Sequence, residues 1–307
     1  MSGQVGYVGH HATHLVAPTE GNQALPGVGE PSTWAPKPER RPLYPFQPLI
    51  TTIATTASNS GSKYNSLQAS VRQRMSRGVE FMASYTLGKV TTNNRGFYGS
   101  GGLTANEGAY WQNTYNPEAE WGPAFFDVRH NLVLSSTYEL PFGRDRQIGA
   151  GWNAVTNALL GGWRLSGIFT TRSGVPVTVI DGRARSLQGE RGFERPNCVG
   201  DWKPADQTLN QWLDITGFEA VALGTFGNCP VGVARAPGYT NLDLVLSKRF
   251  AVGGLRYAEF RVEAFNILNH PSFGAPGRDI ATPNTFGIIR STVSAPRVVE
   301  LVFKFHF

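Results

Sequence analysis

Three histidines near the N-terminus are the closest approach to a metal-binding cluster in the sequence. His10, His11 and His14 lie within five residues of one another, and imidazole nitrogens bind transition metals. However, only Glu20 follows them at a short distance, and neither a thiol nor another carboxylate stands at ligand spacing. We therefore interpret them as loop or interface histidines, with metal capture as the alternative, and we predict neither a metal nor a cofactor.

A catalytic site is equally hard to assemble from the sequence. Asp127 and His130 could form an acid–base pair, but no nucleophile motif accompanies them. Gly99, Gly101 and Gly102 do not form a phosphate-binding loop, because no lysine follows them and no helix is expected there. We interpret Asp127 and His130 as hydrogen-bonding residues at the start of a strand, and we predict no catalytic residue and no enzymatic activity.

The two cysteines, Cys198 and Cys229, both fall inside one long loop-like segment. Two thiols cannot form a tetrahedral zinc site unaided, and no histidine lies near them. A disulfide formed in an oxidising compartment is the interpretation we favour. Two free thiols are the alternative.

The positive charge of the chain is spread out. Its formal net charge is +6, and charged residues make up 16% of the sequence, against about 25% in an ordinary soluble domain. The densest arginine groups are Arg40–Arg41 and the set Arg183, Arg185, Arg191 and Arg195, in stretches rich in proline and glycine. We expect solvated loop charges there and no nucleic-acid partner.

The elements that must position any site are long, two-faced strands. At the C-terminus Val299, Leu301, Phe303, Phe305 and Phe307 alternate with more polar residues, which is typical of a strand between lipid and a polar interior. The same alternation predicts seven clear strands, with a weaker first one at 4–15: they cover 64–75, 79–89, 128–140, 163–172, 241–250, 256–267 and 297–307.

The length of these strands favours a membrane. Most have 10 to 12 residues, whereas strands of soluble proteins are usually about 5–6 residues long and crossing a bilayer takes about 9–11. Neither a signal peptide nor a run of 18 apolar residues is recognisable. A membrane protein of this kind must therefore be a closed barrel, because lipid offers no partners to backbone polar groups.

Connection lengths and aromatic positions agree with that interpretation. Short and long connections alternate, as the periplasmic turns and extracellular loops of outer-membrane barrels do, so we predict a periplasmic C-terminus. A helix is expected near 152–160. Glu259, Arg261 and Glu263 should share the polar, lumen-facing side as a charge ladder rather than a substrate site. We predict an interfacial aromatic belt of Tyr64, Tyr85, Tyr138, Trp163, Tyr239, Tyr257 and Phe307.

Several segments resemble one family. The run 260–274, FRVEAFNILNHPSFG, is similar to the penultimate strand and loop of TonB-dependent receptors of the Oar-like group, which carry a carboxypeptidase-regulatory-like N-terminal domain. Further similar segments are GYVG at 6–9, YNSLQ at 64–68, DVRHN at 127–131, LPFG at 140–143 and GGWRLSG at 161–167.

The resemblance implies an outer-membrane barrel of 22 strands around an N-terminal plug, energised through a periplasmic coupling protein that contacts the plug. Residues 1–307 would be the C-terminal part of that barrel, without the plug, and would act in ligand uptake. The ending Phe303–Phe307 is similar to the signal that the barrel assembly machinery recognises, with Phe303, Phe305 and Phe307 as its aromatic residues.

Two other architectures stay open at this point. One is a small closed barrel of eight strands, acting as an anchor or adhesin, in which the strands at 4–15 and 297–307 would pair. The other is a soluble β-sandwich with a carbohydrate-binding or hydrolase function.

Overall fold

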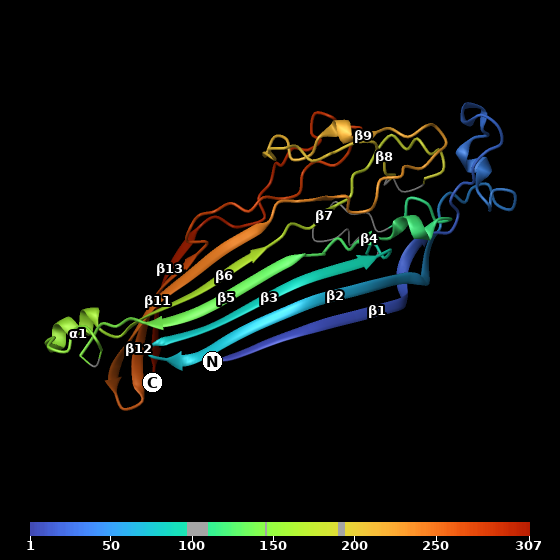
Figure 1. The fold of residues 1–307 in the computed structure, drawn as a ribbon. Helices are drawn as coiled ribbons and strands as arrows, with labels where there is room; N and C mark the ends of the chain where they lie inside the picture. Colours follow the sequence, from blue (N-terminus) through green and yellow to red (C-terminus); the bar gives the residue numbers. More distant parts are fainter. Residues whose placement is uncertain (97–109, 145, 190–193) are drawn as a thin grey trace.

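The fold is one large antiparallel sheet. The computed structural model describes residues 1–96, 110–144, 146–189 and 194–307, and its long strands follow the order β1-β2-β3-β5-β6-β11-β12-β13 (Figure 1). The strands are β1 (Ser2–Glu20), β2 (Ala54–Ser76), β3 (Val79–Thr92), β5 (His130–Glu139), β6 (Trp163–Arg172), β11 (Tyr239–Gly253), β12 (Arg256–Phe265) and β13 (Val298–His306). This arrangement confirms the predicted all-β, antiparallel fold class.

Short elements occupy the connections. They are the strands β4 (Gly122–Pro123), β7 (Pro176–Val177), β8 (Asn197–Cys198), β9 (Phe218–Glu219) and β10 (Ala234–Arg235), the 3-10 helices η1 (Pro31–Thr33), η2 (Lys37–Arg40), η3 (Pro117–Glu120) and η4 (Ile215–Gly217), and the helix α1 (Ala154–Leu160). The Asn153 side chain caps α1 by accepting from the Thr156 amide, as expected at a helix start. In the described residues, no helix combines the length and apolar character that crossing a bilayer would require.

The first two strands are much longer than their sequence pattern indicates. β1 begins at Ser2 and continues to Glu20, and β2 extends back to Ala54. Two register shifts, between Ala12 and Ala17 of β1, interrupt their ladder. A bulge inserts an extra residue and so moves the following side chains to the other face. The alternation therefore changes phase there, which hides the second half of both strands from a search for strict alternation.

The turns between neighbouring strands explain the predicted hairpins. Arg77 and Gly78 join β2 to β3 with φ angles of 50° and 82°. Two successive positive φ angles match the twist of the flanking strands in a two-residue hairpin. Only glycine adopts this conformation without cost, so the sequence Arg-Gly fixes the turn through its second residue.

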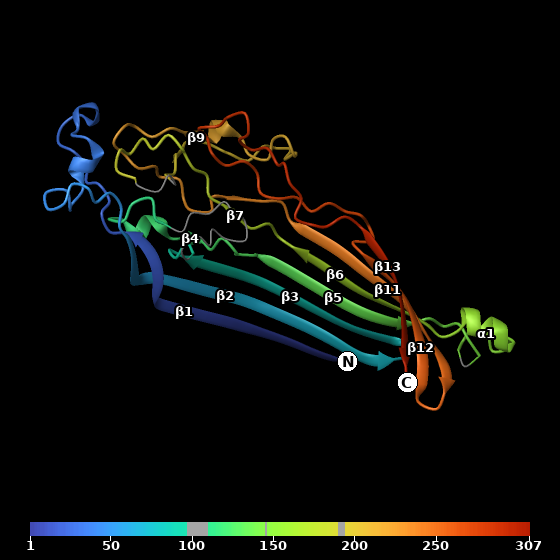
Figure 2. The ribbon, with the colours of Figure 1, turned by 180° about the vertical axis from the view of Figure 1, so that it is seen from behind.

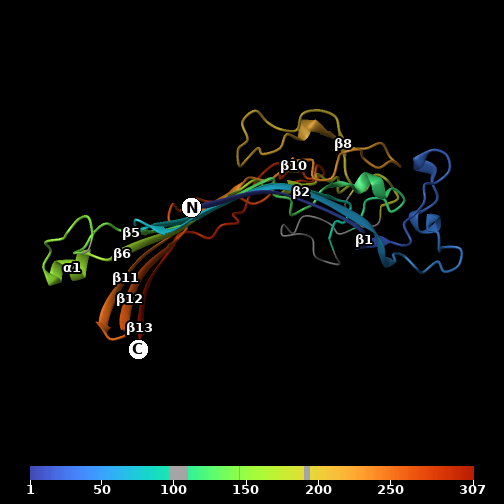
Figure 3. The ribbon, with the colours of Figure 1, turned by 60° about the horizontal axis from the view of Figure 1, so that its bottom comes forward.

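Long and short connections lie at opposite ends of the sheet. The described residues of the connections 21–53, 93–129, 173–238 and 266–297 gather at one end, whereas the β2–β3 turn, the β11–β12 turn and α1 lie at the other (Figures 1 and 2). We call the described residues of the four long connections the cap. Seen from below, the sheet is one curved layer between the cap and α1 (Figure 3).

The sheet is open. Among its described strands, β1 pairs only with β2, and β13 pairs only with β12. A self-closed barrel of eight strands would need a ladder between β1 and β13, so that alternative is wrong for this structure. The soluble sandwich does not fit either, because the other sheets formed by the described residues have only two short strands each.

The ladder register gives the sheet two distinct faces. One cross-strand row runs Val79, Tyr138, Leu165, Leu246, Val262, Leu301, and we call this side the apolar face. The adjacent row runs Glu80, Thr137, Ser166, Val245, Glu263, Glu300, and we call this side the polar face. The alternation read along each strand thus extends across six neighbouring strands, so the sheet as a whole is amphipathic.

The buried hydrophobic core lies in the cap, away from the sheet. Val179, Leu213 and Phe218 of the β6–β11 connection pack with Ile280 and Phe286 of the β12–β13 connection. The rings of Phe218 and Phe286 meet edge to face with centroids 5.6 Å apart. The segment predicted to be loop-like therefore forms a small packed unit.

Candidate functional site

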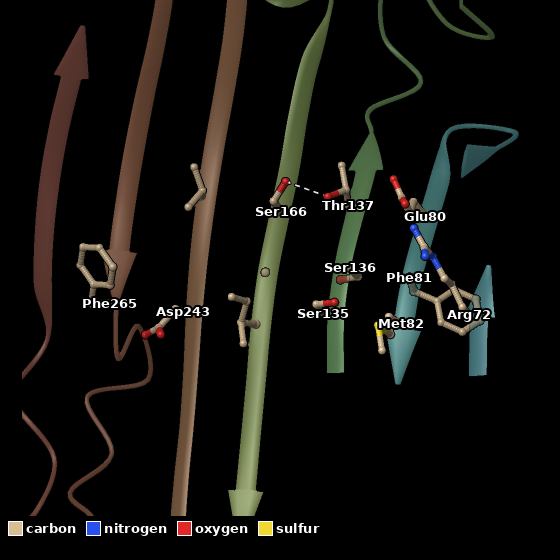
Figure 4. Close-up of a pocket in the computed structure, with 13 residues that line it drawn as sticks. Arg72, Glu80, Phe81, Met82, Ser135, Ser136, Thr137, Ser166, Asp243 and Phe265 are labelled. Carbon is tan, nitrogen blue, oxygen red and sulfur yellow. Dashed lines mark hydrogen bonds between the residues drawn. The ribbon is translucent and has the colours of Figure 1, made fainter. Parts of the chain in front are cut away.

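The polar face holds a hollow of about 560 Å³. Its floor comes from β3, β5, β6 and β11 (Figure 4), with Arg72 and Glu80 on one side and Asp243 on the other. The hydroxyls of Thr137 and Ser166 lie between them, 3.1 Å apart. Asp243 is held in place because one carboxylate oxygen accepts from the Asn266 amide at 2.8 Å. The hollow thus combines charges and hydroxyls with apolar side chains such as Met82, Ile168 and Phe265.

Charged residues on the polar face pair with one another, as the sequence predicts. Arg249 of β11 lies directly opposite Glu259 of β12, and their Nε and Oε1 atoms are 3.7 Å apart. On β12 itself, Arg261 Nη1 lies 3.2 Å from Glu263 Oε1. These partly exposed pairs contribute little to stability. On this part of the polar face, positive and negative side chains therefore alternate, and no group of like charges is formed by these four residues.

The cap is built around a buried carboxylate. The side chain of Glu120 is 0% exposed, and Arg195 Nη1 donates to both of its oxygens at 3.0 Å. Arg195 is 2% exposed and also donates to the carbonyls of Ala119 and Cys229, each at 2.9 Å. Arg95 adds a longer contact of 3.5 Å to Glu120. Since these residues belong to two different connections, the cluster ties the β3–β5 and β6–β11 connections together.

Asp127 and His130 do not pair with each other, and each hydrogen-bonds elsewhere near the start of β5. Asp127 is buried and pairs instead with Arg235 of the β6–β11 connection, while it accepts from the Val90 amide at 2.6 Å. His130 hydrogen-bonds through Nδ1 to the Tyr85 hydroxyl, at 2.8 Å. Asp127 therefore acts as a second tie between the cap and the strand ends, and it has no acid–base partner in His130.

Comparison with known proteins identifies the family to which this sheet architecture belongs. A family model described as "Outer membrane beta barrel domain" matches residues 1–300. The chain belongs to the outer membrane beta-barrel domain family. A search of curated proteins found no match.

A solved structure is also similar to this barrel domain. It is the outer membrane transporter YddB from Escherichia coli, with 12% sequence identity and a TM-score of 0.46. The similarity covers 99% of the present chain and 30% of that transporter chain. The barrel domain thus spans less than a third of the length of that protein.

The structure corrects the expectation that the loop arginines are solvated. Arg195 and Arg41 were expected to be solvated, yet both are buried in the cap of the barrel domain. Arg183 matches the expectation better, because its side chain is 44% exposed while it pairs with Asp181. Arg191 and the glycines at 99, 101 and 102 lie outside the described residues. The partner of Arg195 stands 75 residues away, which a local pattern cannot reveal.

The ladder register divides the residues of the predicted aromatic belt between the two faces of the sheet. Tyr85, Tyr138 and Trp163 lie on the apolar face, but the ladder register places Tyr64, Tyr239 and Tyr257 on the polar face. Two of these carry an arginine over the ring, Arg172 on Tyr239 and Arg249 on Tyr257. The belt prediction is wrong for these three tyrosines, because nearness to a strand end does not determine the face.

The N-terminal histidines are separated by the pleat of β1. His10 and His11 point to opposite sides of the strand, and His14 follows in a left-handed conformation with φ 57°. Among the described residues, no group of three or more histidine, cysteine, aspartate or glutamate side chains could hold a metal ion.

The cysteines of the barrel domain meet inside the cap. The structure joins Cys198 and Cys229 as a disulfide with a Cα–Cα distance of 4.9 Å, within the usual range of about 4.4–6.8 Å. We predict that protein isolated from cells without reductant will not react with a maleimide even after denaturation, and will bind two equivalents once reduced. Mass spectrometry of the labelled protein checks this. Labelling in denaturant without reductant would show free thiols instead.

A second buried carboxylate gives the cap a pH dependence. Burial raises the pKa of Glu194, while hydrogen bonds from the Ser186 hydroxyl and amide act in the opposite direction. The folded cap therefore retains this proton to a higher pH than the unfolded chain does. The corresponding stabilisation is complete below the ordinary pKa of 4.5 and is lost as pH rises through the raised pKa.

We predict that the free energy of cap opening falls with rising pH above about 4.5, with a slope of at most about 1.4 kcal/mol per pH unit from this one proton. Glu194→Gln should remove that part of the slope. Hydrogen exchange of cap amides across a pH series measures the effect, and Glu219→Gln, at an exposed cap position, is the control. An unchanged slope in Glu194→Gln would contradict the assignment.

Proposed function

We propose that this chain is the C-terminal part of the barrel of a TonB-dependent outer-membrane transporter, and that it takes part in ligand uptake rather than catalysis. The observation that carries the proposal is the amphipathic sheet whose edge strands, β1 and β13, each pair with only one neighbour among the described strands. In lipid, such edges are costly unless further strands cover them. The similarity of 260–274 and the other quoted segments to Oar-like receptors supports the same assignment.

The orientation follows from the connections. Outer-membrane barrels carry long connections outside and short turns on the periplasmic side, so the cap would face the exterior and both chain ends the periplasm. The apolar face would then contact lipid, and the polar face with its hollow would line the lumen. In this proposal the cap selects the ligand, and energy reaches the barrel through a plug and a TonB-type coupling protein.

The last strand supplies the proposed assembly signal. Phe303 and Phe305 are 68% and 50% exposed on the apolar face of β13, and Phe307 follows them at 98%. An edge strand with one aromatic face can pair with a strand of the assembly machinery. We predict that Phe305→Ser combined with Phe307→Ser lowers the amount of folded protein in the outer membrane several-fold.

Heat-modifiable mobility of the protein in membrane fractions measures this loss. His306→Ser, on the polar face of the same strand, is the matched control and should leave the amount unchanged. Equal loss in both would indicate a general weakening of the strand instead of recognition of its aromatic face.

One experiment tests the transporter assignment. Antibodies against a cap peptide should detect, in outer-membrane fractions of the native cells, a heat-modifiable protein much larger than the 33.4 kDa of this chain. Formaldehyde treatment of intact cells should link that protein to a TonB-type coupling protein. Detection of a soluble 33 kDa species alone would overturn the proposal, whereas a membrane-bound 33 kDa species would overturn its transporter part.

A further inference from the structure

The connection between β5 and β6 forms a second hollow, on the apolar face and at the end opposite the cap. Its volume is about 410 Å³, within the range of about 300–1,000 Å³ that small-molecule sites occupy. Leu140, Trp163 and Leu246 contribute from the sheet side, and Phe142, Trp152 and Leu160 contribute from the connection. The helix α1 of this connection stands away from the sheet (Figure 1), and its Leu160 is one of the lining residues.

Hydrogen bonds next to the hollow hold the α1 connection against β6 and β11. Lys248 is the cation of β11 on the apolar face, and its ammonium group donates to the carbonyls of Gly161 and Asn157 at the C-terminal end of α1. The indole of Trp163 donates to the Leu159 carbonyl at 2.9 Å. These bonds anchor α1 to β6 and β11. The bond from Trp163 also satisfies the Leu159 carbonyl, one of those that a helix end leaves without a partner inside the helix.

The lining selects an apolar, flexible occupant. Its side chains are leucine, isoleucine, phenylalanine and tryptophan, so the walls offer few hydrogen-bonding side-chain groups to a peptide backbone. The hollow is continuous with the apolar row through Leu246 and Leu165, which in an outer-membrane barrel faces lipid. A hydrocarbon chain of the surrounding bilayer matches both features.

A positively charged side chain lies at the rim of the hollow. Arg144 is exposed, and its Nε donates to the carbonyl of Trp152 at 2.7 Å, which holds the guanidinium beside the wall of the hollow. Arg146, two residues further on, pairs with Glu139 at 2.7 Å and lines a different hollow, so the rim charge is that of Arg144. Guanidinium groups bind phosphate well because they present several donors in a plane. The exposed guanidinium of Arg144 next to an apolar hollow thus complements an anionic lipid headgroup above an acyl chain.

We propose that this hollow binds one glycerophospholipid of the periplasmic leaflet, with an acyl chain between Trp152, Leu160 and Leu246 and its phosphate at Arg144. The site rests on the membrane placement and orientation proposed above, but not on transport. The bound lipid would secure the α1 connection at the membrane surface, where tryptophans are commonly found.

Photo-crosslinking tests the proposal. The protein is reconstituted in vesicles of phosphatidylethanolamine that contain phosphatidylglycerol with a diazirine on one acyl chain. After illumination, peptides carrying Trp152, Leu160 or Leu246 should be labelled at least about fivefold more than peptides of the apolar face of β3. Leu246→Trp, which fills the hollow, should remove this excess.

Leu244→Trp is the matched control, because Leu244 lies two residues away on the same face and is not among the residues lining the hollow. It should leave the excess intact. Arg144→Gln should abolish the preference for phosphatidylglycerol over phosphatidylcholine probes while acyl labelling continues. Heat-modifiable mobility establishes that each variant is folded.

The outcomes separate the site from the membrane assignment. Uniform labelling of the whole apolar face would show an ordinary lipid boundary and would overturn the site, while leaving the membrane placement intact. Absence of labelling on the apolar face would overturn the placement itself. Equal reduction of the excess in Leu246→Trp and Leu244→Trp would also contradict binding in the hollow.

Discussion

Replacing Glu120 with alanine is expected to cost the cap roughly 3–5 kcal/mol, because removing one partner of a buried ion pair leaves the other charge in a poorly solvated place. Arg195 would keep its bonds to the carbonyls of Ala119 and Cys229, but its carboxylate counter-charge would be gone. Native-state hydrogen exchange of the Cys229 amide, which donates to the Pro196 carbonyl at 3.1 Å, reports the opening of this part of the cap.

The control for this experiment lies two residues away on the same 3-10 helix. Glu118 is exposed, so Glu118→Ala should change the opening free energy by no more than about 0.5 kcal/mol. Heat-modifiable mobility should be unaffected in both variants, because the sheet does not depend on the cluster. A cost below about 1 kcal/mol for Glu120→Ala would mean that the cluster carries no net stabilisation of the cap.

The sheet could be predicted from the sequence because its information is local. Alternation within a strand such as 256–265 depends on neighbouring residues, and a hairpin such as Arg77-Gly78 depends on two. Both signals are present in short windows. The predicted strand bounds are accurate where the alternation is uninterrupted, and they are too short for β1 and β2, whose register shifts break the period.

The cap could not be predicted in the same way, because its information is distant. Glu120 becomes meaningful only beside Arg195, and Asp127 only beside Arg235, across separations of 75 and 108 residues. No periodic pattern links such residues, so composition alone indicated loops with solvated charge. The disulfide could be expected from the count of two cysteines, whereas its place within the buried core of the cap could not.

The face on which each aromatic residue lies could be predicted from the sequence for only some of the strands. Tyr85 and Tyr239 both looked like belt residues, since both are aromatic and both were assigned to strand ends. Only the ladder register shows that Tyr239 lies beside Arg172 on the polar face. Predicting a membrane belt therefore requires the face of each residue, which a single-strand pattern gives only when its phase is unbroken.

An arginine introduced on the apolar face tests whether that face contacts lipid. Leu134 lies in the middle of β5, between Ala83 and Phe169 on the neighbouring strands. Leu134→Arg should destabilise the protein in vesicles by about 2–4 kcal/mol, the cost of arginine near the midplane of a barrel's lipid face. Denaturant titration of the vesicle-inserted protein measures the change.

The adjacent residue is the matched control, since Ser135 lies on the polar face and lines the hollow with Asp243. Ser135→Arg introduces the same side chain one residue away, where water or polar groups can solvate it, so its cost should stay below about 1 kcal/mol. The reverse order of the two costs would mean that the apolar face packs inward on a protein core and that the polar face is the outer one. Because one residue step changes the face but almost nothing else, the difference between these two variants isolates the solvent that each face meets.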